Sequence, residues 1–249
     1  MIRRVAIGMA TVWAATLAVI YGVWISDGCQ AFMPFISDLD VYPRTDLIFT
    51  LGLATAGALM FISAWQFSTY RGHWIAASGV EPKWSAVNRI GMYSGMIGAI
   101  CVVWISVTPW NEALYLHIGQ AFLIFGGGLV FIFCQTIITE PMSRIEPRLD
   151  RLKTPRLAFL LLTVASICLI FLNFARMSAA AEDVSIAGMR SIMDAHFTEV
   201  EICTSFAHQA LSEAAFFEWT MTAGLGLSLL TGLSELSILT ASDSDDCEE

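Results

Sequence analysis

Six polar side chains interrupt or border the long apolar stretches of this sequence: Asp38, His117, Gln120, Gln135, Glu218 and Thr222. Gln135 follows His117 by 18 residues, which is five helical turns and puts both side chains on one helix face. Thr222 follows Glu218 by about one turn. Because burying a polar group in lipid costs free energy, these residues are the candidates for a polar or lipid-binding site.

We hypothesise that His117, Glu218 and Asp38 converge near the outer membrane face, with Gln120 and Thr222 as their neighbours. A buried glutamate is tolerated when it gains a hydrogen-bonding or ionic partner, and a histidine can supply one. Two interpretations remain open. The pair could lock two helices together through a hydrogen bond, or it could present a polar notch to a lipid headgroup, with Asp38 at the rim.

The composition indicates which elements must position these residues. Hydrophobic residues make up 56% of the 249-residue chain, charged residues only 14%, and the mean hydropathy is +0.66. A soluble domain carries about 25% charged residues. We therefore expect an all-α polytopic membrane protein. Six apolar runs are long enough to cross a hydrocarbon layer of about 30 Å: residues 5–25, 47–69, 90–107, 113–138, 157–174 and 211–233.

These runs predict a single six-helix membrane domain over residues 1–240, followed by an acidic disordered tail over residues 241–249. Helices satisfy their own backbone hydrogen bonds, which lipid cannot do. The runs also lack the alternation that is typical of a transmembrane barrel. Arg3 and Arg4 precede the first run, which is too long for a cleaved signal sequence and is expected to be a signal anchor.

The distribution of positive charge predicts the orientation of the six helices. With both termini in the cytosol, ten of the 13 lysines and arginines fall in cytosolic segments, and only Arg44, Arg176 and Arg190 fall outside. Short cytosolic loops carry an excess of lysine and arginine in membrane proteins. The net charge of −9 and the absence of a basic stripe argue against nucleic acid as a partner.

The cysteines predict a disulfide and no metal site. Cys29 and Cys203 both fall in the predicted outer loops, where a disulfide can persist, and closing so long a loop would stabilise the fold. Cys101, Cys134 and Cys168 lie within the apolar runs and are expected to be plain apolar fillers. The spacings of cysteine and histidine give no support for a zinc site.

The third outer loop, at about residues 175–210, carries a helical pattern. Its apolar residues recur at spacings of three and four, which places them on one face of a helix: Ile186, Met189, Met193, Phe197 and Val200. We expect an amphipathic helix that lies on the outer membrane surface or against the bundle.

Several short motifs occur in a fixed order from residue 34 to residue 236. The first outer loop contains Pro-Phe-Ile-Ser-Asp at residues 34–38, followed by Pro43. The fourth run opens with His117 and Gly119 and closes with Gln-Thr-Ile-Ile-Thr at residues 135–139. The sixth run carries Glu-Trp at residues 218–219, Leu-Thr at residues 230–231 and Glu-Leu at residues 235–236.

This ordered set resembles the DRAM/Frag/Sfk family of six-span membrane proteins, which includes autophagy modulators, GPI-anchor remodelling factors and phosphoinositide-kinase regulators. An acidic residue is expected after the histidine in the autophagy modulators, and Ile118 stands there instead. The resemblance implies a non-enzymatic integral membrane regulator of lipid or membrane-trafficking state. It implies residence in an endomembrane such as the Golgi or lysosome, or in the plasma membrane.

An alternative function is a structural accessory subunit of a larger membrane complex, which would extend the location to an organellar inner membrane. The subunit would hold its neighbours through outer loops and glycine-rich helix faces, because small residues let helices approach closely. Membrane lipids are expected partners under either reading, and no cofactor is expected. An enzyme would need more ionisable groups than the spans carry, and channels or carriers are disfavoured because no span shows a charged stripe.

The orientation gives the first testable prediction. A cysteine placed at Lys153 should stay unlabelled when sealed cells are treated with a membrane-impermeant thiol reagent, because residues 139–156 carry cytosolic charge. Labelling of that cysteine from outside would overturn the assignment.

Overall fold

The structure is a computed structural model that describes residues 2–30, 33–180, 186–201, 203 and 209–245. These residues form α-helices joined by short turns. In chain order the elements are α1 (Ile2–Ser26), α2 (Asp38–Val41), α3 (Asp46–Ala77), α4 (Lys83–Ile105), α5 (Trp110–Ser143), the 3₁₀ helix η1 (Pro147–Leu152), α6 (Lys153–Ala180), α7 (Ile186–Glu201) and α8 (Gln209–Asp245).

Six of these helices (α1, α3, α4, α5, α6 and α8) are long and apolar enough to span a membrane, which confirms the predicted all-α six-span architecture. The helices are longer than the apolar runs. The 32 residues of α3 extend for about 48 Å, whereas the hydrocarbon layer is about 30 Å thick. The additional turns carry polar and charged residues. A span defined by apolar residues stops before them, although the helix continues through them.

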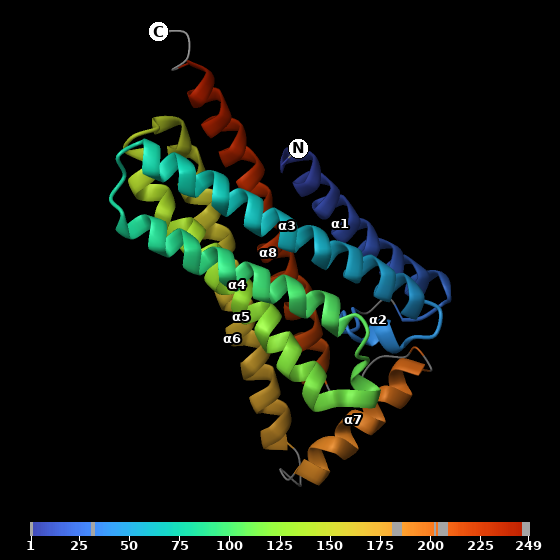
Figure 1. Ribbon diagram of the computed structural model, residues 1–249. Helices are drawn as coiled ribbons and strands as arrows, with labels where there is room; N and C mark the ends of the chain where they lie inside the picture. Colours follow the sequence, from blue (N-terminus) through green and yellow to red (C-terminus); the bar gives the residue numbers. More distant parts are fainter. Residues whose placement is uncertain (1, 31–32, 181–185, 202, 204–208, 246–249) are drawn as a thin grey trace.

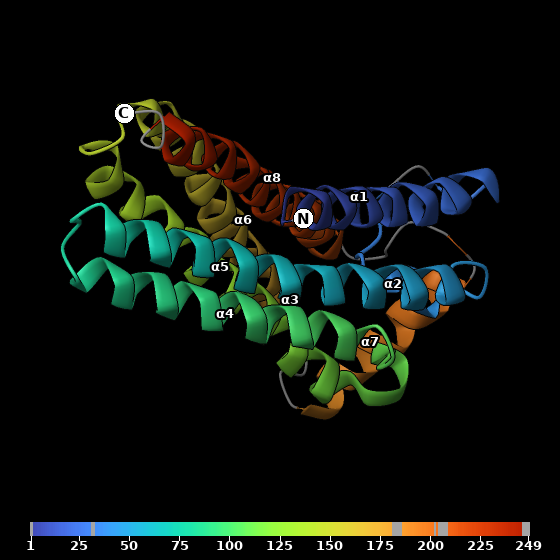
Figure 2. The ribbon, with the colours of Figure 1, turned by 45° about the horizontal axis from the view of Figure 1, so that its top comes forward.

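The spans pack as consecutive neighbours. Helix α1 lies beside α3, α3 beside α4, α4 beside α5, and α6 beside α8 (Figures 1 and 2). One end of the bundle, here named the terminal end, contains the start of α1, the last turns of α8 and the α3–α4 turn (Figure 1). The opposite end, named the α7 end, contains α2 and α7 (Figure 1). This arrangement follows from an even number of spans.

Small residues permit close contacts between helices. Gly127 of α5 lies against the backbone of Ser94 and Gly98 on α4, and Gly224 of α8 lies against Thr163 of α6. A side chain at either glycine would push the helices apart. These glycine faces are therefore used within the chain.

Helix α7 forms within the loop where an amphipathic helix was expected, and it packs against the bundle. Val200 is fully buried, and the Phe197 ring lies 5.8 Å from the Trp110 ring, edge to face. His196 is also buried on this side of the helix. The side chains of Ile186, Met189 and Met193 lie outside the described residues.

The C-terminal boundary of the membrane domain differs from the prediction. Helix α8 continues to Asp245, so a disordered tail does not begin at residue 241. No proline or glycine follows Gly232 to end the helix, so acidic composition alone marked the boundary incorrectly. Residues 246–249 lie outside the described residues.

Cys29 and Cys203 form the predicted disulfide, with their Cα atoms 4.9 Å apart across a sequence separation of 174 residues. The Gln30 backbone N–H also donates to the Cys203 carbonyl at 3.2 Å. The first loop is therefore fastened to Cys203, two residues after the end of α7. This link and the packing of α7 hold residues 34–41 and α7 over the α7 end of the bundle, where they form a cap.

Removing the disulfide should destabilise the cap. We expect the Cys29→Ser, Cys203→Ser double variant to lose about 2–4 kcal/mol in free energy of unfolding, because an uncrosslinked unfolded chain is less constrained. The measurement is unfolding in detergent, with non-reduced peptide maps to verify the link in the wild type. Cys168→Ser, which changes an exposed free cysteine, is the control. An unlinked Cys29 peptide in the wild-type map would contradict the pairing.

Candidate functional site

The loop of residues 34–38 is held by polar groups of α8. The Trp219 indole N–H donates to the Pro34 carbonyl at 2.7 Å, and Glu218 Oε2 accepts from the Ile36 backbone N–H at 2.7 Å. Buried backbone groups need such partners, since water cannot reach them. Two adjacent residues of α8 thus fix the path of a loop that lies more than 180 residues away in sequence.

Asp38 connects this loop to α7. Its Oδ1 lies 3.0 Å from His196 Nε2, and its Oδ2 accepts from the Phe35 backbone N–H at 2.9 Å. The Asp38 and His196 side chains are only 2% and 1% exposed. We name this region, comprising residues 34–41, α7 and the Glu218–Trp219 pair, the α2–α7 platform.

His117 and Gln120 bind a different loop. His117 Nδ1 lies 2.7 Å from the Thr108 carbonyl oxygen, and Gln120 Nε2 donates to the Thr108 hydroxyl at 3.3 Å. A carbonyl can only accept a hydrogen bond, so His117 Nδ1 carries the proton in this tautomer. These contacts fasten the turn between α4 and α5 to the first buried turns of α5.

The predicted convergence of Asp38, His117 and Glu218 is met in part. Asp38 lies within electrostatic range of both other residues. In the described part of the chain, however, no hydrogen bond or ion pair joins His117 to Glu218. The acid–histidine pair that forms is Asp38 with His196, because α7 brings His196 over α2.

Two further predicted residues lie elsewhere. Thr222 is buried and lines a small cavity of about 80 Å³ between the helices, together with Met60 and Leu225. Gln135 lies near the opposite end of α5, where its carbonyl accepts from Arg156. Five turns along one helix face keep Gln135 aligned with His117 but separate them by about 27 Å, so Gln135 is not part of the α2–α7 platform.

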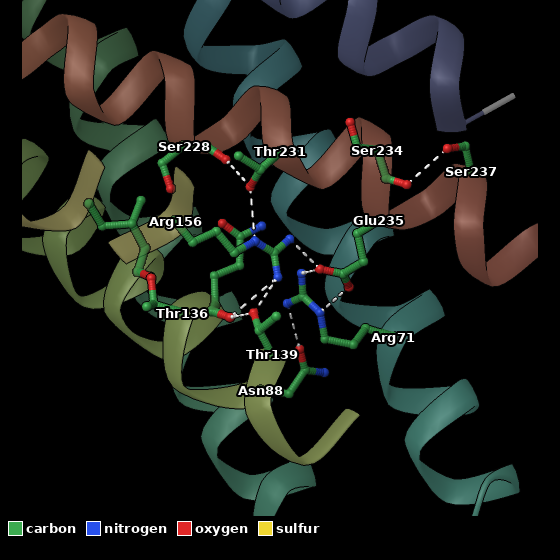
Figure 3. Close-up of polar contacts among 12 residues, drawn as sticks. Arg71, Asn88, Thr136, Thr139, Arg156, Ser228, Thr231, Ser234, Glu235 and Ser237 are labelled. Atoms are coloured by element: carbon green, nitrogen blue, oxygen red, sulfur yellow. Dashed lines mark hydrogen bonds and ion pairs between the residues drawn. The ribbon is translucent and has the colours of Figure 1, made fainter. Parts of the chain in front are cut away.

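Gln135 belongs instead to a buried cluster at the terminal end, which the sequence did not predict. Glu235 of α8 accepts hydrogen bonds from Arg71 of α3 through Nε at 2.5 Å and Nη2 at 3.0 Å, and it also pairs with Arg156 of α6 (Figure 3). All three charged side chains are at most 4% exposed. We name this group the arginine cluster.

Neutral partners complete the arginine cluster. Arg71 Nη1 donates to Asn88 Oδ1 at 3.2 Å, Arg156 Nη1 donates to the Thr139 hydroxyl at 2.7 Å, and Arg156 Nε donates to the Thr231 hydroxyl at 2.9 Å (Figure 3). The cluster joins α3, α4, α5, α6 and α8. Buried charges are tolerated only with such complete pairing.

Arg71 and Arg156 were expected in loops between the spans, and this expectation was wrong. Both lie on helices inside the bundle, because α3 and α6 extend past the apolar runs and Glu235 compensates their charge. The family motifs contained a signal for the arginine cluster, since Thr139, Thr231 and Glu235 each belong to one of these motifs. The motifs did not indicate which residues would be their partners.

Several carboxyl groups lie near one another at the α2–α7 platform. Asp40 is 3% exposed, and its Oδ2 has no hydrogen-bond partner among the residues that the structure describes. Burial, together with the negative charges of Asp46 and Glu112, raises the pKa of Asp40 to about 7. The structure brings no three metal-ligating side chains together within its described ranges.

The fold and these two polar regions define a class of protein. It is a polytopic membrane protein with six helical spans, a cap at one end and the buried arginine cluster at the other. A family model described as the Frag1/DRAM/Sfk1/Cwh43P N-terminal domain matches residues 2–238, and the chain belongs to this family. No curated protein and no solved structure matches the chain.

Neutralising Glu235 should strongly destabilise the bundle. Glu235→Gln leaves two buried guanidinium groups without a counter-charge, and we expect a loss of about 3–5 kcal/mol in free energy of unfolding. Thermal or denaturant unfolding of the purified protein measures it.

Glu140→Gln is the matched control for this variant. Glu140 pairs with Arg144 and Lys153 at the same end of the bundle, but its side chain is 51% exposed, so solvent screens the interaction. Equal unfolding midpoints for the two variants would contradict the structural role of Glu235.

Proposed function

We propose that the protein is a non-enzymatic regulator of the lipid or trafficking state of its membrane, in an endomembrane or the plasma membrane. The observation that carries the proposal is the α2–α7 platform, in which a family motif at residues 34–38 is held in one conformation by α7 and α8. A polar surface at the end of a six-span bundle is suited to contact headgroups or a membrane partner.

The contacts of the platform also favour a non-enzymatic role. General acid–base catalysis needs a side chain within hydrogen-bond reach of a substrate proton. Asp38 places one oxygen on His196 and the other on the Phe35 backbone, and Glu218 binds the Ile36 backbone. These carboxyl groups therefore bind other groups of the same chain.

A second candidate function is that of an accessory subunit in a larger membrane complex. Gly119 and Gly126 of α5 are seven residues apart, so they share a helix face. A Cβ at either position would meet nothing within 4 Å in this chain. Such an open small-residue face permits another helix to approach closely.

Mild purification should separate the two functions. We expect native mass spectrometry of the protein in nanodiscs to show bound lipid without a stoichiometric set of other proteins. A fixed set of protein partners would favour the accessory subunit and contradict the regulator. Gly126→Leu should release such partners if α5 carries them, whereas Gly8→Leu on α1, where a Cβ also meets nothing within 4 Å, is the control.

Glu218→Gln tests whether the platform binds a charged ligand or only supports packing. The glutamine oxygen can still accept from the Ile36 N–H, so the loop should stay in place while the carboxyl group is lost. If the carboxyl group serves recognition, the variant should keep its unfolding midpoint and lose its bound lipid. A lowered midpoint with bound lipid retained would assign Glu218 to packing alone.

A further inference from the structure

Among the side chains that the structure describes, the α2–α7 platform concentrates acidic groups with few bases to balance them. The titratable groups that face Asp38, Asp40 or His196 come from five helices: Asp46 on α3, Glu112 and His117 on α5, Glu199 on α7, Glu218 on α8, and Asp38 and Asp40 on α2 itself. Arg44 of the same loop is 69% exposed and pairs with Asp27 instead. The imidazoles are therefore the bases available to the platform among these facing groups.

The charge of Asp40 is poorly compensated. Its side chain is buried beside Asp46 and Glu112, and Oδ2 receives no hydrogen bond from the residues that the structure describes. An ionised carboxylate in such a place loses its hydration and is repelled by its neighbours. A bound proton removes both costs.

His196 is the group through which α7 reaches α2. The Nε2–Oδ1 contact with Asp38 is 3.0 Å long and almost fully buried, and the imidazole also lies against the Trp110 ring, 5.6 Å between centroids. A protonated imidazole turns this contact into an ion pair, whereas a neutral imidazole leaves only a hydrogen bond. The strength of α7 docking thus depends on the proton of His196.

We propose that the α2–α7 platform is a proton-operated clamp: protonation of Asp40 and His196 holds α7 against α2, and loss of these protons loosens the cap. The two groups act in the same direction although one is an acid and the other a base. This inference does not depend on the proposed function.

The direction of the pH dependence follows from the two environments. Burial alone would lower the pKa of His196, but the charge and hydrogen bond of Asp38 more than offset it, so the pKa is raised. The pKa of Asp40 is raised to about 7 by burial and by Asp46 and Glu112. His196 therefore holds its proton more tightly when α7 is docked beside Asp38. Asp40 holds its proton more tightly when α2 is packed beside Asp46 and Glu112, which is the arrangement of α2 on which α7 docks. Docking is therefore favoured in mild acid and weakens as pH rises through the docked-state pKa values.

Hydrogen exchange of the full-length protein in nanodiscs tests the clamp. Each pH unit between the undocked and docked pKa values of a group changes the docking equilibrium about tenfold. We expect protection factors of the α7 amides, corrected for intrinsic exchange, to be at least about tenfold higher at about pH 5 than at about pH 8. Equal α7 protection at the two pH values would overturn the proposal.

Two variants with matched controls identify the proton sites. Asp40→Asn removes the charge permanently, so α7 should lose less protection than the wild type at about pH 8; this gain cannot result from misfolding. His196→Gln should lower protection at about pH 5. Asp150→Asn and His73→Gln, both exposed and far from α7 in the fold, should behave as the wild type.

Addition of Ca²⁺ has its own outcome in the same experiment. If Ca²⁺ restores α7 protection in the wild type at high pH, the carboxylates bind a metal ion in place of the proton and the proposal is overturned. If Asp40→Asn loses protection with rising pH to the same extent as the wild type, Asp40 is not a proton site of the clamp, which also overturns it.

Discussion

Glu235 is the residue on which the packing of the spans depends most, because it pairs with two arginines that reach it from different helices. Arg71 and Arg156 extend the connection further through Asn88 and Thr139. Five of the six spans therefore share one polar network at the terminal end. Each of the two guanidinium groups would be too costly to bury alone, and the carboxylate makes their burial possible. Elsewhere along the helices, glycine contacts let α4 approach α5 and α6 approach α8 closely.

The two ends of the bundle are stabilised by different physical means. The terminal end relies on charge pairing within the helices, close to their ends. The α7 end relies on a disulfide, on side chains that bind loop backbone, and on aromatic packing around His196. A permanent ion network gives one fixed geometry, whereas a cap held in part by a titratable pair can respond to its surroundings. The permanent charges thus lie at one end of the bundle and the titratable pair at the other.

The family motifs are explained by contacts between distant segments. The motif at residues 34–38 and the Glu218–Trp219 motif bind each other directly at the α7 end. The motif at residues 135–139 and the residues Thr231 and Glu235 meet at the terminal end, where Arg156 contacts all of them. Each motif thus supplies one side of an interaction whose other side lies elsewhere in the chain. The membership of the chain in the Frag1/DRAM/Sfk1/Cwh43P family rests on the whole of residues 2–238, and the structure shows why the motifs must occur together.

The sequence by itself determined the number of spans, their helical character, the presence of a helix after α6 and the pairing of Cys29 with Cys203. These features follow from local apolar length, from helical periodicity and from a small set of candidate cysteines on one side. The partners of the polar residues were decided only by the tertiary structure. Asp38 binds His196 rather than His117, and Gln135 lies with the arginines rather than with the acids. Hydropathy reports depth in the membrane but carries no information on which helices are neighbours. A hydropathy pattern also ends a span at the first charged residue. The helix nevertheless continues, because a glutamate distant in sequence can compensate that charge within the bundle.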